Sequence, residues 1–152
     1  MKRLMTAFFF VMTIRSVNAQ TLAGRWQEKT PKVSSGYLGN YQFSDDGTFL
    51  YNTNEYFGLA RIKSLEGNYT YNTQTHVLSL TVLFVDEIAG GTIERSKESG
   101  EATDSWTING GEIKKIKLIK PAKTTINVEF GKSNNNEEQS VFFDKVKYYK
   151  VE

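Results

Sequence analysis

The stretch YQFSDDGTFLYNTNEYF, residues 41–57, decides the fold. Tyr41 and Phe43 alternate with polar neighbours before the turn Asp45-Asp46-Gly47, and aromatic residues alternate again after it. An alternation of period two is typical of a strand with one buried face. An Asp-Gly turn between two such runs is the strongest short-range signal of a β-hairpin. The stretch therefore predicts two antiparallel strands joined by a tight turn.

A second hairpin is expected at Leu65–Val82, LEGNYTYNTQTHVLSLTV, where a polar segment again separates two alternating runs. On its far strand Leu78, Leu80, Val82 and Phe84 are expected to share one face. Between the two hairpins, Asn52–Lys63 is expected either to continue the first hairpin or to form a lid.

More short strands are expected on both sides of these hairpins. Asn109-Gly110-Gly111 has the chemistry of a primed turn, so Ala102–Asn109 and Glu112–Ile119 are expected to form a third hairpin. Pro121 is expected to end the second of these strands, because proline cannot donate to a ladder. The remaining expected strands are Gly24–Glu28, Thr92–Glu98 (an edge strand or a loop, after a Gly90-Gly91 turn), Thr124–Gly131, and Gln139–Val151 with a bulge or barrel end at Asp144.

These segments amount to about eight to ten short strands at regular spacing, and no long helix is expected. Such spacing indicates a sandwich or a barrel. Short turns between successive strands favour an up-and-down order, and closing the sheet removes its exposed edges. The fold class is therefore predicted to be all-β, a single antiparallel up-and-down β-barrel over residues 20–152.

The first residues have the features of a cleaved leader. Lys2 and Arg3 precede an apolar run at Leu4–Ile14, and small residues precede Gln20. A membrane-spanning helix needs about 20 apolar residues. Met1–Ala19 is therefore interpreted as a signal peptide, and the mature protein is expected to be secreted or periplasmic, with no membrane span.

Charge and cysteine content exclude several classes of function. Cleavage would remove Lys2, Arg3 and Arg15 and no acid, leaving 16 basic against 17 acidic residues from the 19 and 17 of the full chain. The net charge of the mature chain would be near −1, so the composition gives no argument for nucleic acid or an anionic membrane as partner. Because the chain has no cysteine, it must be stable without disulfides.

Several of these residues together resemble the lipocalin-like proteins secreted by Bacteroidetes-type bacteria. They are the Gly24-x-Trp26 pair, the F-x-x-D-G-T-F motif at Phe43–Phe49, and the G-x-Y-x-Y motif before alternating leucines. The resemblance covers most of Leu22–Leu83. Two features of the family, a T-D-Y turn motif and a C-terminal helix, are not found in this sequence. It implies a calycin-like β-barrel in which Trp26 plugs one end.

Catalysis is not expected, and neither is a metal or another cofactor. His76 is the single histidine and lies in a polar turn, so it is interpreted as a surface residue. Asp45 and Asp46 are interpreted as turn residues. A basic strip of lysines is interpreted as a solvated strand face that pairs with acids such as Glu101 or Asp104, with anion binding as the alternative. They are Lys114, Lys115, Lys117, Lys120 and Lys123.

Aromatic residues at alternating positions give the candidate binding site. Buried tyrosines need partners for their hydroxyl groups, which favours a cavity with water or ligand over a filled barrel. The predicted lining is Tyr41, Phe43, Tyr51, Tyr69, Tyr71 and Trp106.

The sequence thus predicts a non-catalytic, monomeric protein that binds a small apolar or amphipathic molecule inside its barrel. The alternative is a packed barrel that docks another envelope protein through its surface, for example through Tyr56–Leu59. Cavity volume separates these hypotheses, because a packed interior favours docking.

Overall fold

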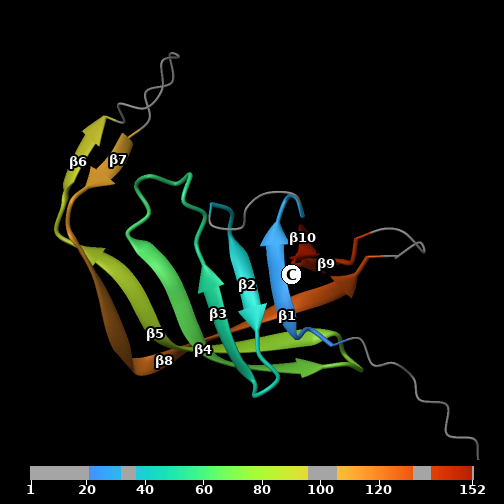
Figure 1. Ribbon diagram of the computed structural model, residues 1–152. Helices are drawn as coiled ribbons and strands as arrows, with labels where there is room; N and C mark the ends of the chain where they lie inside the picture. Colours follow the sequence, from blue (N-terminus) through green and yellow to red (C-terminus); the bar gives the residue numbers. More distant parts are fainter. Residues whose placement is uncertain (1–20, 32–36, 96–105, 132–137, 152) are drawn as a thin grey trace, which may run out of the picture.

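The computed structural model describes residues 21–31, 37–95, 106–131 and 138–151 (Figure 1). The expected leader lies outside these residues. The described strands are β1 (Gly24–Glu28), β2 (Asn40–Phe43), β3 (Thr48–Asn52), β4 (Ile62–Asn72), β5 (Val77–Ala89), β6 (Thr92–Arg95), β7 (Trp106–Asn109), β8 (Glu112–Phe130), β9 (Ser140–Phe143) and β10 (Val146–Val151). Within the described ranges, no helix is long and apolar enough to cross a membrane.

Eight of these strands form a closed antiparallel barrel in the order β1-β10-β9-β8-β5-β4-β3-β2. Strands that follow one another in the chain are neighbours in the barrel, except that β8 follows β5. The two strands between them, β6 and β7, form a separate two-stranded sheet. The barrel closes where β1 pairs with β10, with Trp26 opposite Lys150. The predicted all-β, up-and-down antiparallel barrel is confirmed.

The first predicted hairpin is present as β2 and β3, with Phe43 opposite Phe49. Gly47 occupies its turn with a φ of 83°, a conformation that glycine adopts without strain. The Asp46 carboxylate accepts hydrogen bonds from the Thr48 hydroxyl at 2.6 Å and from the Thr48 backbone nitrogen at 2.9 Å. These bonds favour the charged form and lower the pKa of Asp46, the side-chain bond contributing most.

The second predicted hairpin is present as β4 and β5, but one residue on β5 is not where it was expected. Leu78, Leu80 and Val82 are buried together in the core. A register irregularity lies between Val82 and Phe84. An extra residue reverses the alternation of a strand, so Phe84 lies opposite the polar residue Glu66 and does not join the core cluster.

The expected end of a strand at Pro121 is wrong, because β8 continues through it to Phe130. Val82 of β5 pairs with Ala122 and Phe84 pairs with Lys117, so residues 118–121 bulge opposite Leu83 alone. Bulged residues take no part in the ladder, and proline is tolerated there. The bulge coincides with the sharp bend of β8 at the lower left of Figure 1.

The expected third hairpin is also wrong: β7 pairs with β6, and β8 pairs with β5. Two double glycines, Gly90-Gly91 and Gly110-Gly111, join the long β5–β8 ribbon to the β6–β7 ribbon, and all four have φ values between 72° and 88°. A Cβ on Gly91 would lie 2.9 Å from the backbone oxygen of Gly110. The glycines therefore form a bend between two ribbons and do not reverse the chain. We call β6 and β7 the arm; it projects at the upper left of Figure 1.

The last expected strand is instead a hairpin. Phe143 pairs with Val146, leaving Asp144 and Lys145 as a two-residue turn with φ values of 47° and 76°. Positive φ at both positions is the requirement of a type I′ turn. Asp144 is a turn residue, but Lys145 stands where such a turn usually has glycine, so a hairpin was not expected there. The inward residue is Phe143, which is buried, and not its neighbour Phe142.

The core occupies the inside of the barrel. It combines the aliphatic residues of β5 and β8 with the aromatic residues of β1, β2, β3, β9 and β10. Its fully buried large members include Trp26, Phe43, Leu22, Leu78 and Val141. Trp26 is 1% exposed, as expected for a plug.

Candidate binding site

One row of inward side chains crosses seven strands of the barrel, from β10 to β8. The strand registers place in it Lys150, Trp26, Tyr41, Tyr51, Leu65, Val85 and Ile116. From Trp26 onward the exposure rises: Trp26 is buried, Tyr41 to Val85 are half-buried, and Ile116 is 39% exposed. The row thus leads from the closed core to an open end on β8.

Tyr41 lies at the centre of an aromatic cluster inside the barrel. Its ring centroid is 4.5 Å from that of Tyr51, 5.5 Å from Phe43, 5.3 Å from Phe143 and 5.6 Å from Tyr148. Separations of this size are those of aromatic rings in direct contact. The rings that were expected to surround a ligand therefore pack against one another.

The phenols of this cluster are held in their neutral form. Burial raises the pKa of Tyr41, and the nearby Tyr51 and Asp144 raise it further. Burial likewise raises the pKa of Tyr148, with smaller contributions from Tyr41, Tyr51 and Glu28. Removal from water disfavours the phenolate, so these groups can donate and accept hydrogen bonds but are poor acids.

The structure brings together four of the six predicted site residues. Tyr41, Phe43 and Tyr51 are in the cluster, and Tyr69 joins it with its ring 4.8 Å from that of Phe43. The Tyr69 hydroxyl donates to the backbone oxygen of Ser44 at 3.0 Å.

The other two predicted site residues make no ring contact with this cluster, although Tyr71 also packs against the barrel core. Tyr71 packs against Phe130, with ring centroids 6.3 Å apart, and its hydroxyl lies 3.2 Å from Nδ1 of His76. Trp106 was expected inside the barrel and is not there. It lies on β7 of the arm, 47% exposed, with the Arg95 guanidinium 5.8 Å from its ring centroid. Its misplacement follows from the strand pairing, because the arm lies outside the barrel sheet.

Sequence reasoning did not include Phe143 and Tyr148 in the site, although both lie beside Tyr41. Tyr148 could have been found from its alternation with neighbouring polar residues. Phe143 could not, because the Asp144-Lys145 turn that sets its direction lacks the glycine that usually marks a two-residue hairpin turn.

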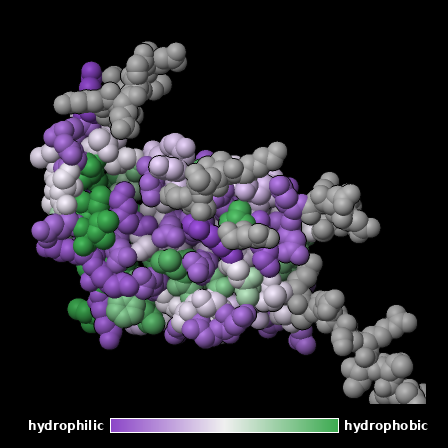
Figure 2. Space-filling model, viewed as in Figure 1, coloured by the Kyte–Doolittle hydropathy of each residue, from purple (hydrophilic) through white to green (hydrophobic). Residues whose placement is uncertain are grey.

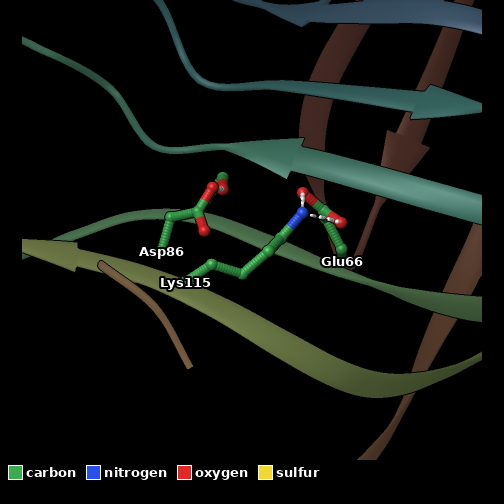
Figure 3. A network of polar contacts seen from close by, with 4 residues as sticks. Glu66, Asp86 and Lys115 are labelled. Atoms are coloured by element: carbon green, nitrogen blue, oxygen red, sulfur yellow. Dashed lines mark hydrogen bonds and ion pairs between the residues drawn. The ribbon is translucent and has the colours of Figure 1, made fainter. Parts of the chain in front are cut away.

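A second row, of polar side chains, runs beside the first on the opposite face of the same strands. It contains Gln27, Asn40, Asn52, Ser64, Asp86 and Lys115. Asn52 donates to Asn40 at 3.1 Å, and Ser64 donates to Asp86 at 2.8 Å. Lys115 reaches the carboxylate of Glu66 at 2.7 Å (Figure 3). Hydrogen bonds within the row keep these strands in register.

The described residues also line several surface grooves. One of about 600 Å³ contains His76, Glu129, Phe142, Asp144 and Lys145. Asp144 is already engaged there, since it accepts hydrogen bonds from the backbone and the amide of Asn127. In the part of the chain that the structure covers, no three histidine, aspartate or glutamate side chains are grouped as a metal site. Tyr41, Tyr51 and Tyr69 do not line this groove.

The arm is amphipathic. Ile93 pairs with Ile108 and Arg95 pairs with Trp106, which places these four side chains on one face. The other face is polar, and there Glu94 accepts hydrogen bonds from Thr92 at 2.9 Å and from Asn109 at 3.0 Å. The arm therefore presents one apolar face.

The loop between β3 and β4 supports the arm. The backbone nitrogen of Ile108 on β7 donates to the oxygen of Gly58 at 3.0 Å. A Cβ on Gly58 would lie 2.5 Å from the Trp106 oxygen, so the two backbones are in close contact. The Arg61 guanidinium donates to the oxygens of Ile88 and Gly90, at 3.1 and 2.8 Å, at the bend beneath the arm.

Exposed apolar side chains gather on this loop and the arm. Tyr56 is 73% and Phe57 65% exposed. The exposed apolar residues of this loop and of the arm, which we call the arm surface, are Tyr56, Phe57, Leu59, Ile93 and Trp106. Figure 2 shows a hydrophobic area at the left, at the base of the arm. Apolar side chains gathered in this way on a protein surface mark sites of interaction.

Comparison of the chain with known proteins finds no matching family model, no matching curated protein and no matching solved structure. The site must therefore be interpreted from its own geometry.

Proposed function

We propose that this protein is a secreted or periplasmic, non-catalytic binding protein that docks another envelope protein on its arm surface. A packed, lipocalin-like barrel serves as the scaffold. The observation that carries the proposal is the contrast between the two aromatic groups. The rings inside the barrel contact one another, whereas Tyr56, Phe57 and Trp106 face solvent.

The support of the arm favours a binding role over a flexible extension. Backbone contact with Gly58 and the Arg61 bonds to the bend hold the arm against the loop. A held surface loses little conformational entropy on binding, which improves affinity. Its exposed aromatic residues are of the types that dominate protein interfaces.

Site-specific photo-crosslinking in the producing cell tests this proposal. A photoreactive phenylalanine in place of Phe57 is expected to form one defined protein adduct, and Trp106→Ser is expected to abolish it. The same group at Val146, which is also exposed but lies on β10, is the matched control. An adduct that forms equally from both positions, or none from position 57, would refute docking at the arm surface.

A second candidate is the binding of a small apolar ligand at the open end of the inward row. It is favoured by Ile116, which is inward by register and yet 39% exposed, and by half-buried Tyr51 and Leu65 in the same row. Lipid extraction with native mass spectrometry of protein from its own cell tests it. A bound small molecule that Tyr51→Trp displaces would support the carrier role, and an empty protein together with a Phe57 adduct would support docking.

A further inference from the structure

The bend of β8 carries an unusual set of exposed residues. Lys117, Ile119, Lys120, Pro121 and Lys123 are all exposed, and Ile119 is fully so. We call this segment the lysine corner. It lies at the lower left of Figure 1, and the arm lies at the upper left.

Lys114 and Lys115 of β8 lie near carboxylates, whereas, in the described structure, the lysines of the corner do not. Lys115 pairs with Glu66 at 2.7 Å, and Lys114 lies 3.9 Å from Glu112. The acids Glu101 and Asp104, which were expected to pair with the strip, lie outside the described residues.

The corner lysines face uncharged neighbours. On β5, Thr81 lies opposite Lys123 and Phe84 lies opposite Lys117. Among the described residues, Lys117, Lys120 and Lys123 make no ion pair. The corner thus concentrates positive charge.

Protection of an open edge explains part of this arrangement. Only residues 128–130 of β8 pair with β9, so most of its second edge has no strand beside it in the described structure. Lysine and proline on such an edge prevent pairing with other chains. This explanation does not account for Ile119, because a fully exposed isoleucine increases the tendency of an edge to associate.

We propose that the lysine corner binds the surface of an anionic lipid bilayer. Lysines within a few ångströms of anionic headgroups are attracted to them, and an apolar side chain between them can enter the boundary of the acyl chains. Ile119 lies between Lys117 and Lys120 in the bulge, which supplies both interactions at one protruding point. The overall charge near neutrality does not oppose this, because screening limits each interaction to about 10 Å.

Sedimentation with vesicles tests the proposal on the full-length chain. Phosphatidylglycerol–phosphatidylcholine vesicles are compared with phosphatidylcholine vesicles at low and moderate salt. Replacement of Lys117, Lys120 and Lys123 by Gln is expected to lower binding to the anionic vesicles by about 100-fold, at about fivefold per lysine. Residues 1–20 are the same in all variants, so differences report the corner.

The matched control replaces Lys29, Lys145 and Lys147 by Gln, which removes the same charge from exposed positions outside the lysine corner. It is expected to keep most of the binding. Equal losses in the two triple variants would show that any exposed lysines contribute equally to the attraction and would overturn the proposal. Thermal melting of each variant confirms that it is folded.

The variant Ile119→Ser distinguishes binding to a bilayer from binding to a soluble polyanion. It is expected to weaken vesicle binding severalfold and to leave binding of inorganic polyphosphate unchanged. If Ile119→Ser has no effect on vesicles while the lysine variant loses both ligands, the corner is a polyanion site and the bilayer proposal is wrong. The arm surface is unaltered in these variants, so the outcome is independent of docking there.

Discussion

The indole Nε1 of Trp26 donates a hydrogen bond to the backbone oxygen of Leu22 at 2.7 Å, and both residues are almost completely buried. The ammonium of Lys150 lies 5.7 Å from the centroid of the same ring. Leu22 precedes the first strand and Lys150 belongs to the last. One side chain therefore joins the segments that close the barrel.

Trp26→Ala should lower the free energy of unfolding by about 3–5 kcal/mol, because it leaves a large cavity in the core. Denaturant midpoints measure this loss. The other tryptophan of the chain provides the control, since Trp106→Ala on the exposed arm should cost about 0.5 kcal/mol or less. A loss below about 1 kcal/mol for Trp26→Ala would contradict the role of a buried plug.

Lys145→Gly should raise stability by about 1 kcal/mol, because residue 145 has a φ of 76° that only glycine adopts without cost. Lys145→Ala removes the same charge but keeps the backbone cost, so it should give no such gain. Thermal melting of the two variants checks this difference. Equal stabilities would place the turn in another conformation.

Gly67→Ala should destabilise the barrel by about 3 kcal/mol or more, since a Cβ there would lie 1.9 Å from the backbone oxygen of Thr81. Gly90→Ala is the comparison, because a Cβ at that position meets nothing within 4 Å. The only free-energy cost of that substitution is the cost of placing alanine at a φ of 77°. About 1 kcal/mol is expected for it. The ranking of the two chemical denaturation midpoints tests the close approach of β4 and β5.

Stability should fall above about pH 10, the usual pKa of a tyrosine. Burial raises the pKa of Tyr41 in the folded state, so its contribution is complete below the unfolded pKa and is lost as pH rises toward the folded one. Tyr41→Phe should make the alkaline decline of the melting temperature shallower. A Tyr41→Phe variant with the wild-type slope would contradict the burial of that hydroxyl.

The sequence alone determined the parts of the fold that depend on neighbouring residues. The alternation around Gly47 predicted β2 and β3, and the alternation within Leu65–Val82 predicted β4 and β5. Period-two alternation sets the buried face of a strand, and turn residues set the pairing of adjacent strands. Tyr41, Phe43, Tyr51 and Tyr69 could be placed in one interior for this reason.

Only the tertiary structure decided the arm and the bends. Gly110-Gly111 has the composition of a hairpin turn, but the choice between β7–β8 and β6–β7 pairing depends on contacts with Gly91 some 20 residues away in the chain. The same choice moved Trp106 from the interior to the surface. Asp144-Lys145 forms a turn without the usual glycine because the barrel requires β9 and β10 to pair there. Tertiary contacts outweigh the cost of two positive φ values.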